Sequence, residues 1–330
     1  MEKISIIVPC RNEEKYITEF IDFILDNDYP KELMEILIID GKSTDDTASI
    51  VKRYTNRYSF IRLLINENRT VPFALNMGIK ISNGDYIIRL DAHSKIPTNY
   101  FSELVKWAKT LDADNIGTIC ITDVKNKTPK SNAIKKVLSS KFGVGNSFFR
   151  IGINNIKKVD TVPFGFYKKE VFNKIGIFNE NLERNQDIEL NKRILRNGGI
   201  IYLLGNISSI YFARENFLEF AKNNFATGKW NVLTVYLTKR FDSLSLRHFI
   251  PLIFILSLIL PILSTIFFSS VWLVSVASFV SYMVLLSIIS LMITDKSTSF
   301  LQVLLAFMIL HFSYGFGSLV GLFRLNYLHK

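Results

Sequence analysis

The chain has 330 residues, of which 48% are hydrophobic, and it carries a formal net charge of +11. Its mean hydropathy of +0.22 is high for a soluble protein, and its two cysteines, Cys10 and Cys120, form no CxxC motif. These values exclude a small disulfide-stabilised domain, and because no recognised nucleic-acid motif accompanies the positive charge, we expect no nucleic-acid partner.

Short apolar runs alternate with segments of helical length in the first part of the chain. Continuous β-branched runs of this length are typical of strands that are buried on both faces of a parallel sheet. Alternation of strand and helix predicts a doubly wound α/β domain. The predicted strands are Ile4–Val8, Ile36–Ile39, Ile61–Ile65 and Tyr86–Leu90, and the helices between them include Glu14–Leu25 and Asp45–Tyr58.

Charged side chains and turn-forming residues follow three of these strands. Arg11 and Glu13 follow the first strand, Asp40 follows the second, and Asp91 and His93 follow the fourth. Ligands of such sheets bind at the carboxyl ends of the strands. Helix capping explains the hydroxyls and carboxylates farther along the second loop, but it does not explain Asp40, which leaves the strand directly.

The second half of the chain carries weaker signals. Further strands are predicted at Asn115–Ile121 and Val159–Val162. An acidic cluster at residues 183–189 leads into a helix that Gly198–Gly199 ends. Phe217–Tyr236 is an aromatic and basic helical stretch that precedes an apolar tail.

The apolar tail predicts a membrane anchor. No Asp, Glu, Lys or Arg occurs from Phe249 to Thr294, and none occurs from Ser297 to Phe323. About 20 apolar residues span a bilayer core, so the tail has room for two or three transmembrane helices. A buried helical core is the alternative, but soluble helices keep a polar face and these segments do not.

The charges beside the tail bear on its orientation. Lys239, Arg240 and Arg247 precede it, and positive charge marks the cytoplasmic side of a crossing. Three crossings would place Arg324 and Lys330 outside, against this tendency, whereas two crossings and an interfacial segment would keep them inside. The number of crossings stays open at this point.

These features predict two parts of the chain with different surroundings. We expect a soluble α/β domain over residues 1–240 and a membrane segment over residues 241–330. Residues 1–248 are predicted to face the cytosol, with multi-pass anchoring in the cell membrane.

The strand-end motifs together resemble those of the family 2 inverting glycosyltransferases of the GT-A fold. Ile-Ile-Val-Pro-Cys-Arg-Asn-Glu-Glu at residues 6–14 is similar to that family's first strand and loop. Ile-Ile-Asp-Gly-Lys-Ser-Thr-Asp-Asp-Thr at residues 38–47 is similar to its second-strand motif, and Leu-Asp-Ala-His-Ser at residues 90–94 to its metal-binding Asp-x-Asp. The resemblance covers about residues 3 to 235 and implies a Rossmann-like, nucleotide-sugar-binding domain.

Three further motifs resemble the succinoglycan-type exopolysaccharide glycosyltransferases within this family. They are Arg-Thr-Val-Pro-Phe-Ala-Leu-Asn at residues 69–76, Val-Gly-Asn at residues 144–146 and Arg-Asn-Gln-Asp at residues 184–187.

The resemblance implies a pocket for the nucleotide. Within it, the Asp40 carboxylate is expected to accept a hydrogen bond from a uracil-type N–H. Arg11 and Glu13 are expected close to the same pocket, with a solvated loop charge as the alternative for each. The residues expected to contact the donor are Pro9, Arg11, Glu13, Asp40, Arg69 and Asp91.

The resemblance also implies a divalent cation, Mn²⁺ or Mg²⁺, that neutralises the leaving diphosphate. Asp91 holds the first position of the metal motif, but the third position holds His93 instead of an aspartate. Imidazole suits Mn²⁺ better than Mg²⁺. Either His93 is a ligand, or Asp91 works with a group that the sequence does not reveal.

The catalytic base implied by the resemblance is Asp187. The family more often has a Glu-Asp pair at this place, and this chain has Gln186-Asp187. The alternative is that Asp187 is only a first-turn helix carboxylate. Gln186, Lys229 and Trp230 are expected on the acceptor or diphosphate side. For Lys229 and Trp230 the alternative is an interfacial anchor beside the membrane.

The expected activity is an inverting transfer of a sugar from a nucleotide-diphosphate donor, a UDP-sugar, in cell-surface or exopolysaccharide synthesis. The membrane tail favours a lipid-linked saccharide or polysaccharide acceptor and contact with membrane lipid. His93 and Gln186 keep open the alternative of an inactive, nucleotide-binding membrane scaffold. Asp40, Asp91 and Asp187 favour the enzyme.

Overall fold

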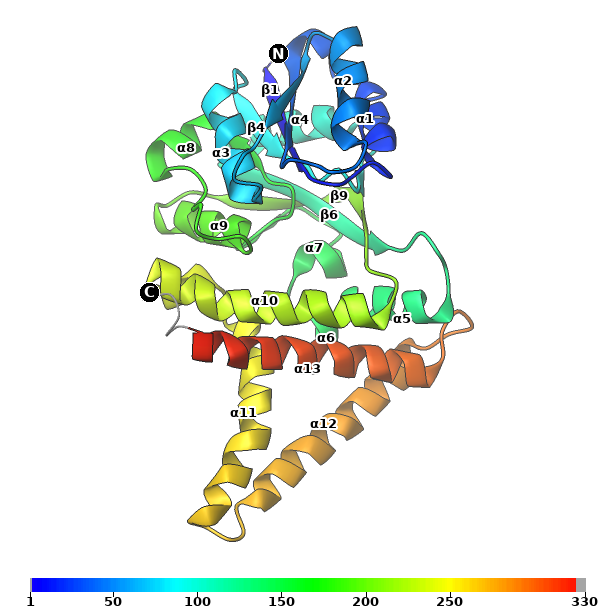
Figure 1. Ribbon diagram of the computed structural model, residues 1–330, viewed down its shortest axis with the longest axis vertical. Coiled ribbons are helices and arrows are strands. Elements are labelled where there is room, and N and C mark those ends of the chain that lie inside the picture. The colour runs from blue at the N-terminus through cyan, green and yellow to red at the C-terminus, as the bar shows by residue number, and fades with distance from the viewer. Residues whose placement is uncertain (1, 325–330) are drawn as a thin grey trace. The chain divides into compact units, whose positions relative to one another are not determined.

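Two compact units make up the part of the chain that the computed structural model describes, residues 2–324 (Figure 1). The first, here called the sheet unit, is drawn from residues 1–121 and 148–212, and the second, the helical unit, from residues 122–147 and 213–330. This division differs in position from the domain boundary expected at residue 240, which stays a prediction.

Four parallel strands form the first half of the sheet in the sheet unit. Their order is β3-β2-β1-β4, and each pairs in parallel with its neighbour. The four strands predicted from the apolar runs are confirmed, because each run lies within or overlaps one of them. The strands are β1 (Ile4–Cys10), β2 (Met34–Asp40), β3 (Ile61–Ile65) and β4 (Tyr86–Arg89).

Helices cover both faces of these strands, which explains why the runs are continuously apolar. Successive side chains of a strand point to opposite faces, so Ile6 and Ile7 of β1 belong to two different buried clusters. The Ile6 cluster includes residues of α1 (Ile17–Leu25), α2 (Thr47–Arg57) and α4 (Tyr100–Leu111). The Ile7 cluster includes residues of α3 (Val71–Ile81), α8 (Lys169–Ile175) and α9 (Gln186–Arg196).

The sheet continues beyond β4 with shorter and mostly antiparallel pairings. β8 pairs antiparallel with both β4 and β6, and β9 pairs antiparallel with β5 and β7. The long β9 was not predicted from the sequence. These strands are β5 (Ser94–Lys95), β6 (Asn115–Asp123), β7 (Lys157–Lys158), β8 (Phe166–Lys168) and β9 (Ile201–Phe212).

The strand predicted at Val159–Val162 is wrong. Val162 packs so closely on Gly117 that a Cβ added to this glycine would lie 2.3 Å from the Val162 Cβ. The Thr161 hydroxyl accepts a hydrogen bond from the Asn191 side-chain amide. The segment is therefore a loop between β7 and β8 that buries apolar side chains without forming a strand.

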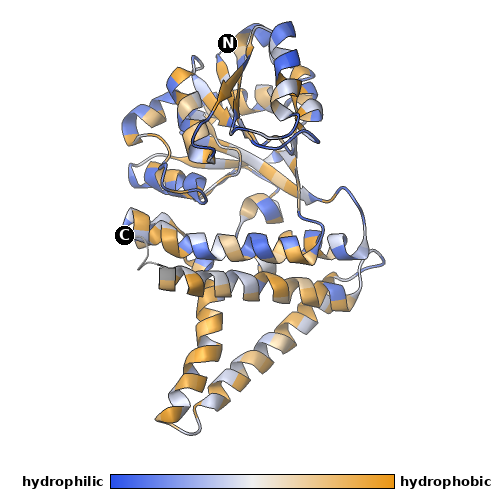
Figure 2. Ribbon diagram, in the orientation of Figure 1, coloured by the Kyte–Doolittle hydropathy of each residue, from blue (hydrophilic) through white to orange (hydrophobic). Residues whose placement is uncertain are grey.

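Within residues 2–324, three helices of the helical unit are long and apolar enough to cross a membrane. The candidate spans are Leu246–Ile266, Trp272–Ile293 and Phe300–Phe323, and Figure 2 colours most of the first two as hydrophobic. The expected C-terminal membrane segment is supported to this extent. The helices of this unit are α5 (Pro129–Leu138), α6 (Lys141–Val144), α10 (Phe217–Thr238), α11 (Ile250–Leu263), α12 (Trp272–Ile293) and α13 (Phe300–Arg324).

The third apolar helix, α13, packs along α10 (Figure 1). A Cβ added to Gly228 of α10 would lie 1.9 Å from the Tyr314 carbonyl oxygen, and one added to Gly317 of α13 would lie 2.0 Å from the Phe225 carbonyl oxygen. Only glycine permits backbones to approach this closely. The number of crossings was weighed in part on the positions of Arg324 and Lys330. The side chain of Arg324 and the whole of Lys330 lie outside what the structure describes.

Candidate active site

A cavity of about 220 Å³ opens at the carboxyl ends of β1, β2 and β4. Parallel strands bring their ends to one edge of the sheet, and here Cys10 lies opposite Asp40 in the register of β1 and β2. The cavity therefore gathers residues from loops that are far apart in the sequence. Those expected on the donor side that line it are Pro9, Arg11, Glu13, Arg69, Asp91 and His93.

The loops around the cavity hold non-glycine residues in the left-handed backbone region. The φ angles of Asn12, Lys42 and Arg69 are 56°, 57° and 63°. Such conformations are costly and gather at functional sites. Gly41 permits the loops to meet, because a Cβ added there would lie 3.1 Å from the Arg69 carbonyl oxygen.

Asp40 lies beside the cavity but does not line it. Its side chain is buried, and its two oxygens accept hydrogen bonds from the Ser43 backbone N–H at 3.2 and 3.0 Å. The Ser43 hydroxyl also donates to it. These bonds fix the carboxylate at the start of the second loop, and its predicted contact with the nucleobase stays a prediction.

Cys10 also lines the cavity. Burial, with the carboxylates of Asp40 and Glu13 nearby, raises the pKa of its thiol well above the ordinary range. The thiol therefore stays protonated at neutral pH and is no nucleophile.

His93 and Glu13 meet on one wall of the cavity. The His93 Nδ1 atom lies 3.2 Å from Glu13 Oε1, and both side chains are partly exposed. The His93 ring also makes edge contacts with Tyr16 and Tyr211. The imidazole is thus held in place next to Asp91, with one nitrogen turned to a carboxylate.

Arg89 is a residue of the site that the sequence prediction missed. Its Nε and Nη2 atoms donate to Asp91 Oδ1 at 3.2 and 3.0 Å, and its Nη1 atom lies 4.0 Å from Asp187 Oδ2. Burial works against its charge, but the carboxylates of Asp91 and Asp187 outweigh this effect and raise its pKa. The sequence shows that Arg89 ends a buried strand two residues before Asp91, but it does not show the contact with Asp187.

Asp187 lies in the first turn of α9, whose N-cap Asn185 has a φ of 62°. Its Oδ1 accepts the Ile188 backbone N–H at 2.9 Å, and its side chain is 34% exposed. Glu189 differs, because it is buried and its carboxylate pairs with Arg193 at 2.8 Å. Asp187 is therefore the accessible carboxylate of the pair.

Gln186 is buried next to Asp187, and its Oε1 atom lacks a hydrogen-bond partner within residues 2–324. Lys229 and Trp230 belong to α10 of the helical unit. The role predicted for these three residues on the acceptor or diphosphate side stays a prediction.

The residues on the cavity wall fit a divalent cation that arrives with a diphosphate. No cluster of three or more His, Cys, Asp and Glu side chains suited to a metal occurs among the described residues. Mg²⁺ is commonly held by one or two carboxylates plus substrate phosphates and water. Asp91 and His93 both line the cavity, so one carboxylate and one imidazole are present for a cation shared with substrate phosphates.

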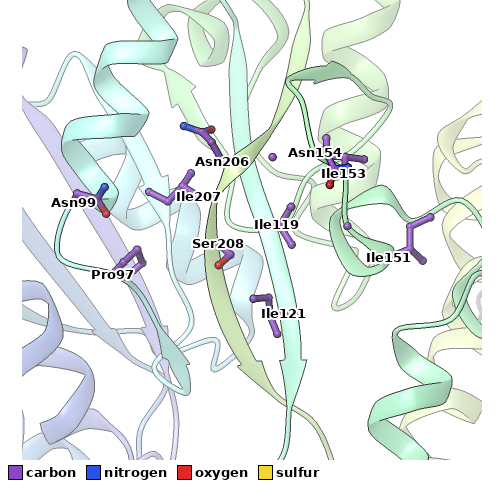
Figure 3. A pocket seen from close by; sticks show the side chains of 12 residues that line it. Pro97, Asn99, Ile119, Ile121, Ile151, Ile153, Asn154, Asn206, Ile207 and Ser208 are labelled. Atoms are coloured by element: carbon purple, nitrogen blue, oxygen red, sulfur yellow. The ribbon is translucent and has the colours of Figure 1, made fainter. Parts of the chain in front are cut away.

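A second cavity, of about 610 Å³, lies along β6 and β9 (Figure 3). Its polar side chains are those of Asn99, Asn154, Asn206 and Ser208, and the others are mainly isoleucines. No residue that lines it is ionisable. It therefore lacks the charges that would hold a diphosphate or a cation, and the smaller cavity is the candidate donor site.

The family model described as glycosyl transferase family 2 matches residues 5–176. The chain belongs to this family. It is 33% identical over 233 residues to a dolichyl N-acetyl-alpha-D-glucosaminyl phosphate 3-beta-D-2,3-diacetamido-2,3-dideoxy-beta-D-glucuronosyltransferase of Methanococcus voltae, which covers 69% of this chain and 72% of that relative. It is 27% identical over 226 residues to the succinoglycan biosynthesis protein ExoA of Rhizobium meliloti, covering 68% of this chain and 67% of the relative.

Solved structures of similar fold agree with this assignment. The mannosyltransferase PcManGT of Pyrobaculum calidifontis, in complex with GDP-Man and Mn²⁺, has a TM-score of 0.60 at 15% identity and covers 96% of this chain and 87% of that chain. Residues 1–349 of TarS from S. aureus, in complex with UDP-GlcNAc, have a TM-score of 0.52 at 17% identity and cover 98% and 92%. At such identities the likeness concerns the fold alone.

These findings confirm the resemblance and the GT-A fold expected from the motifs. The chain is a family 2 glycosyltransferase that acts on a nucleotide sugar. Its three C-terminal apolar helices suggest that it associates with a membrane.

Proposed function

We propose that the chain transfers a sugar from a UDP-sugar to a lipid-linked saccharide or a growing polysaccharide, with inversion of the anomeric configuration. One observation carries the proposal: Arg89 joins the cavity that holds Asp91 to the accessible Asp187 on α9. The carboxylate proposed for the donor side and the proposed base thus both lie near one guanidinium. The UDP-GlcNAc complex of the TarS neighbour and the dolichyl phosphate in the name of the M. voltae relative support the donor and acceptor classes.

In the proposed mechanism, Asp40 and the loops around it hold the nucleotide, with Arg11 and Arg69 on the cavity wall. Asp91 and His93 would hold a divalent cation, Mn²⁺ or Mg²⁺, which when bound supplies positive charge to the leaving diphosphate.

Asp187 acts as the general base. The acceptor hydroxyl attacks the anomeric carbon from the face opposite the diphosphate, and its proton passes to the Asp187 carboxylate as the new carbon–oxygen bond forms. The bond to the diphosphate breaks in the same displacement, which inverts the anomeric configuration.

We also propose that α11 and α12 cross the membrane as a hairpin while α13 lies along α10 at the membrane surface, with the sheet unit in the cytosol. Of the most apolar 18 residues of each candidate span, 11% and 17% are buried inside the protein in the first two spans, but 44% are buried in the third. The glycine contacts bind α13 to α10, which carries the exposed Glu219 and Lys222. A helix tied to such a charged neighbour is suited to the interface.

The test uses the full chain purified in detergent and a panel of nucleotide sugars with Mn²⁺. We expect release of UDP from a UDP-sugar, faster when a lipid-linked saccharide is present, and a product of inverted configuration by NMR. Turnover with GDP-sugars alone would contradict the donor class. Binding of nucleotide sugars without any transfer would instead indicate the inactive scaffold.

A further inference from the structure

The guanidinium of Arg89 lies between two carboxylates with different chemical tasks. One is Asp91 on the cavity wall, and the other is Asp187 at the start of α9. Arg89 is held in place at the end of β4, where its backbone N–H donates to the Gly165 carbonyl at 3.4 Å. Its side chain is only 17% exposed.

The contact with Asp91 is one-sided. Both Arg89 donors, Nε and Nη2, reach the same oxygen, Oδ1. Among the described residues, no hydrogen bond to Asp91 Oδ2 is found. The guanidinium thus fixes the rotation of the carboxylate and leaves Oδ2 for a ligand in the cavity.

The contact with Asp187 is looser. Arg89 Nη1 lies 4.0 Å from Asp187 Oδ2, within ion-pair range but beyond hydrogen-bond range. The Ile188 backbone N–H holds the other oxygen, Oδ1, at 2.9 Å. Oδ2 is therefore oriented by charge without having its lone pairs occupied by Arg89.

We propose that Arg89 is a positioning residue that orients both the donor-side carboxylate of Asp91 and the base Asp187. The planar guanidinium presents its N–H groups in a fixed fork, so it holds Asp91 through two donors while its third nitrogen, Nη1, stays within ion-pair range of Asp187. The inference rests on the proposed function, because it takes Asp91 as the cation ligand and Asp187 as the base. Partners that orient a metal-binding carboxylate typically contribute roughly 10- to 100-fold to metal affinity or activity.

The experiment compares the wild type with Arg89→Lys, Asp187→Asn and the double variant. Arg89→Lys keeps the charge but loses the fork. Arg62→Lys on the exposed face of β3 is the matched control. Binding of UDP in the presence and absence of Mn²⁺ is measured by calorimetry, and kcat and KM are measured with the UDP-sugar. Should Arg89→Lys fail to fold, Arg89→Gln, which keeps an N–H donor, carries the same comparison.

We expect Arg89→Lys to weaken Mn²⁺-dependent UDP binding about tenfold and to lower kcat about 10- to 100-fold, while UDP binding without Mn²⁺ stays unchanged. In the Asp187→Asn background, the additional loss of kcat should be several times smaller than in the wild type. Additive losses of kcat, unchanged Mn²⁺-dependent binding, or tighter binding in Arg89→Lys would each overturn the inference. Tighter binding would mean that Arg89 only occupies the place of the cation.

Failure of the proposed function gives a different pattern. If the wild type neither binds UDP nor turns over a UDP-sugar, the donor assignment falls and the inference falls with it. If the wild type binds and turns over UDP-sugar but Asp187→Asn keeps its full rate, the base assignment alone is wrong. The proposal that Arg89 orients both carboxylates is then overturned, while the binding data still report on the contact between Arg89 and Asp91.

Discussion

His93 replaces an aspartate in the metal motif, and the structure turns its Nδ1 atom toward Glu13 Oε1 at 3.2 Å. A hydrogen bond to one ring nitrogen fixes which nitrogen is left for a metal. Since imidazole suits Mn²⁺ better than Mg²⁺, we expect activity to require a divalent cation and Mn²⁺ to serve at least as well as Mg²⁺. The measurement is the rate in excess chelator, followed by titration with each ion.

His93→Ala should then remove the preference for Mn²⁺ while leaving some activity through Asp91. Glu13→Gln is the companion variant, because it keeps the size of the side chain that holds the imidazole. An unchanged metal response in His93→Ala would show that His93 is structural, and full activity in chelator would exclude the cation altogether.

The base assignment makes a separate prediction. Asp187→Asn keeps the size of the side chain but removes its basicity, so we expect kcat to fall roughly 10²- to 10⁴-fold. Donor binding should change little, because Asp187 is not among the residues proposed to hold the nucleotide. Asp112→Asn is the control, since this carboxylate is 91% exposed. Near-normal turnover in Asp187→Asn would contradict the role.

The site residues differ in how far the sequence could predict them. Asp91, Glu13 and Arg69 follow strands and could be placed near one another from the sheet topology alone. Arg89 could not, because its importance depends on a contact with Asp187 that is 98 positions away in the chain and on the rotamer that makes it. For Lys229 and Trp230, the motif shows where they lie in the sequence, but it does not show whether their side chains reach the active site.

At the scale of elements, the parallel strands were predictable because burial on both faces leaves a continuous apolar run. β9 was not predicted: its 12 residues include Gly205 and the exposed Asn206, which interrupt the alternation of buried and half-buried positions. Val159–Val162 misled because a buried loop can be as apolar as a short strand. In both cases the pairing partner, which the local sequence does not reveal, decides the structure.

The contact between α10 and α13 is an element-scale feature that can be tested. Gly228→Ala would place a Cβ 1.9 Å from the Tyr314 carbonyl oxygen, so the helices must separate. We expect a loss of about 1–3 kcal/mol in stability, the usual cost of overpacking. Thermal unfolding in detergent measures it, with Lys222→Ala on the exposed side of α10 as control. A variant as stable as the wild type would contradict the close packing of these helices.

The proposed hairpin concerns the whole molecule. Phe268, at the turn between α11 and α12, is 66% exposed, and we expect a cysteine placed there to react with a membrane-impermeant maleimide on intact cells. A cysteine at Lys296, between α12 and α13, should react only after the cells are opened. Both native cysteines are buried, which keeps the background low.

A second measurement on intact cells decides the number of crossings. A tag fused after Lys330 should be protected in intact cells if α13 lies at the surface. Accessibility of this tag from outside would indicate three crossings, and access of protease to the sheet unit would contradict its cytosolic placement.

The helical unit is built from two stretches of chain, and this has a consequence for the time course of synthesis. α5 buries Ala133, Ile134 and Val137 in a cluster with residues of α12 and α13, and the Asn132 amide bonds to the Ser297 carbonyl 165 positions later. At a ribosomal rate of about 5–20 residues per second, the partner emerges on the order of 10 to 30 s after α5. For that interval α5 has no α13 to pack against, so the helical unit cannot assemble until long after the first strands of the sheet have been made.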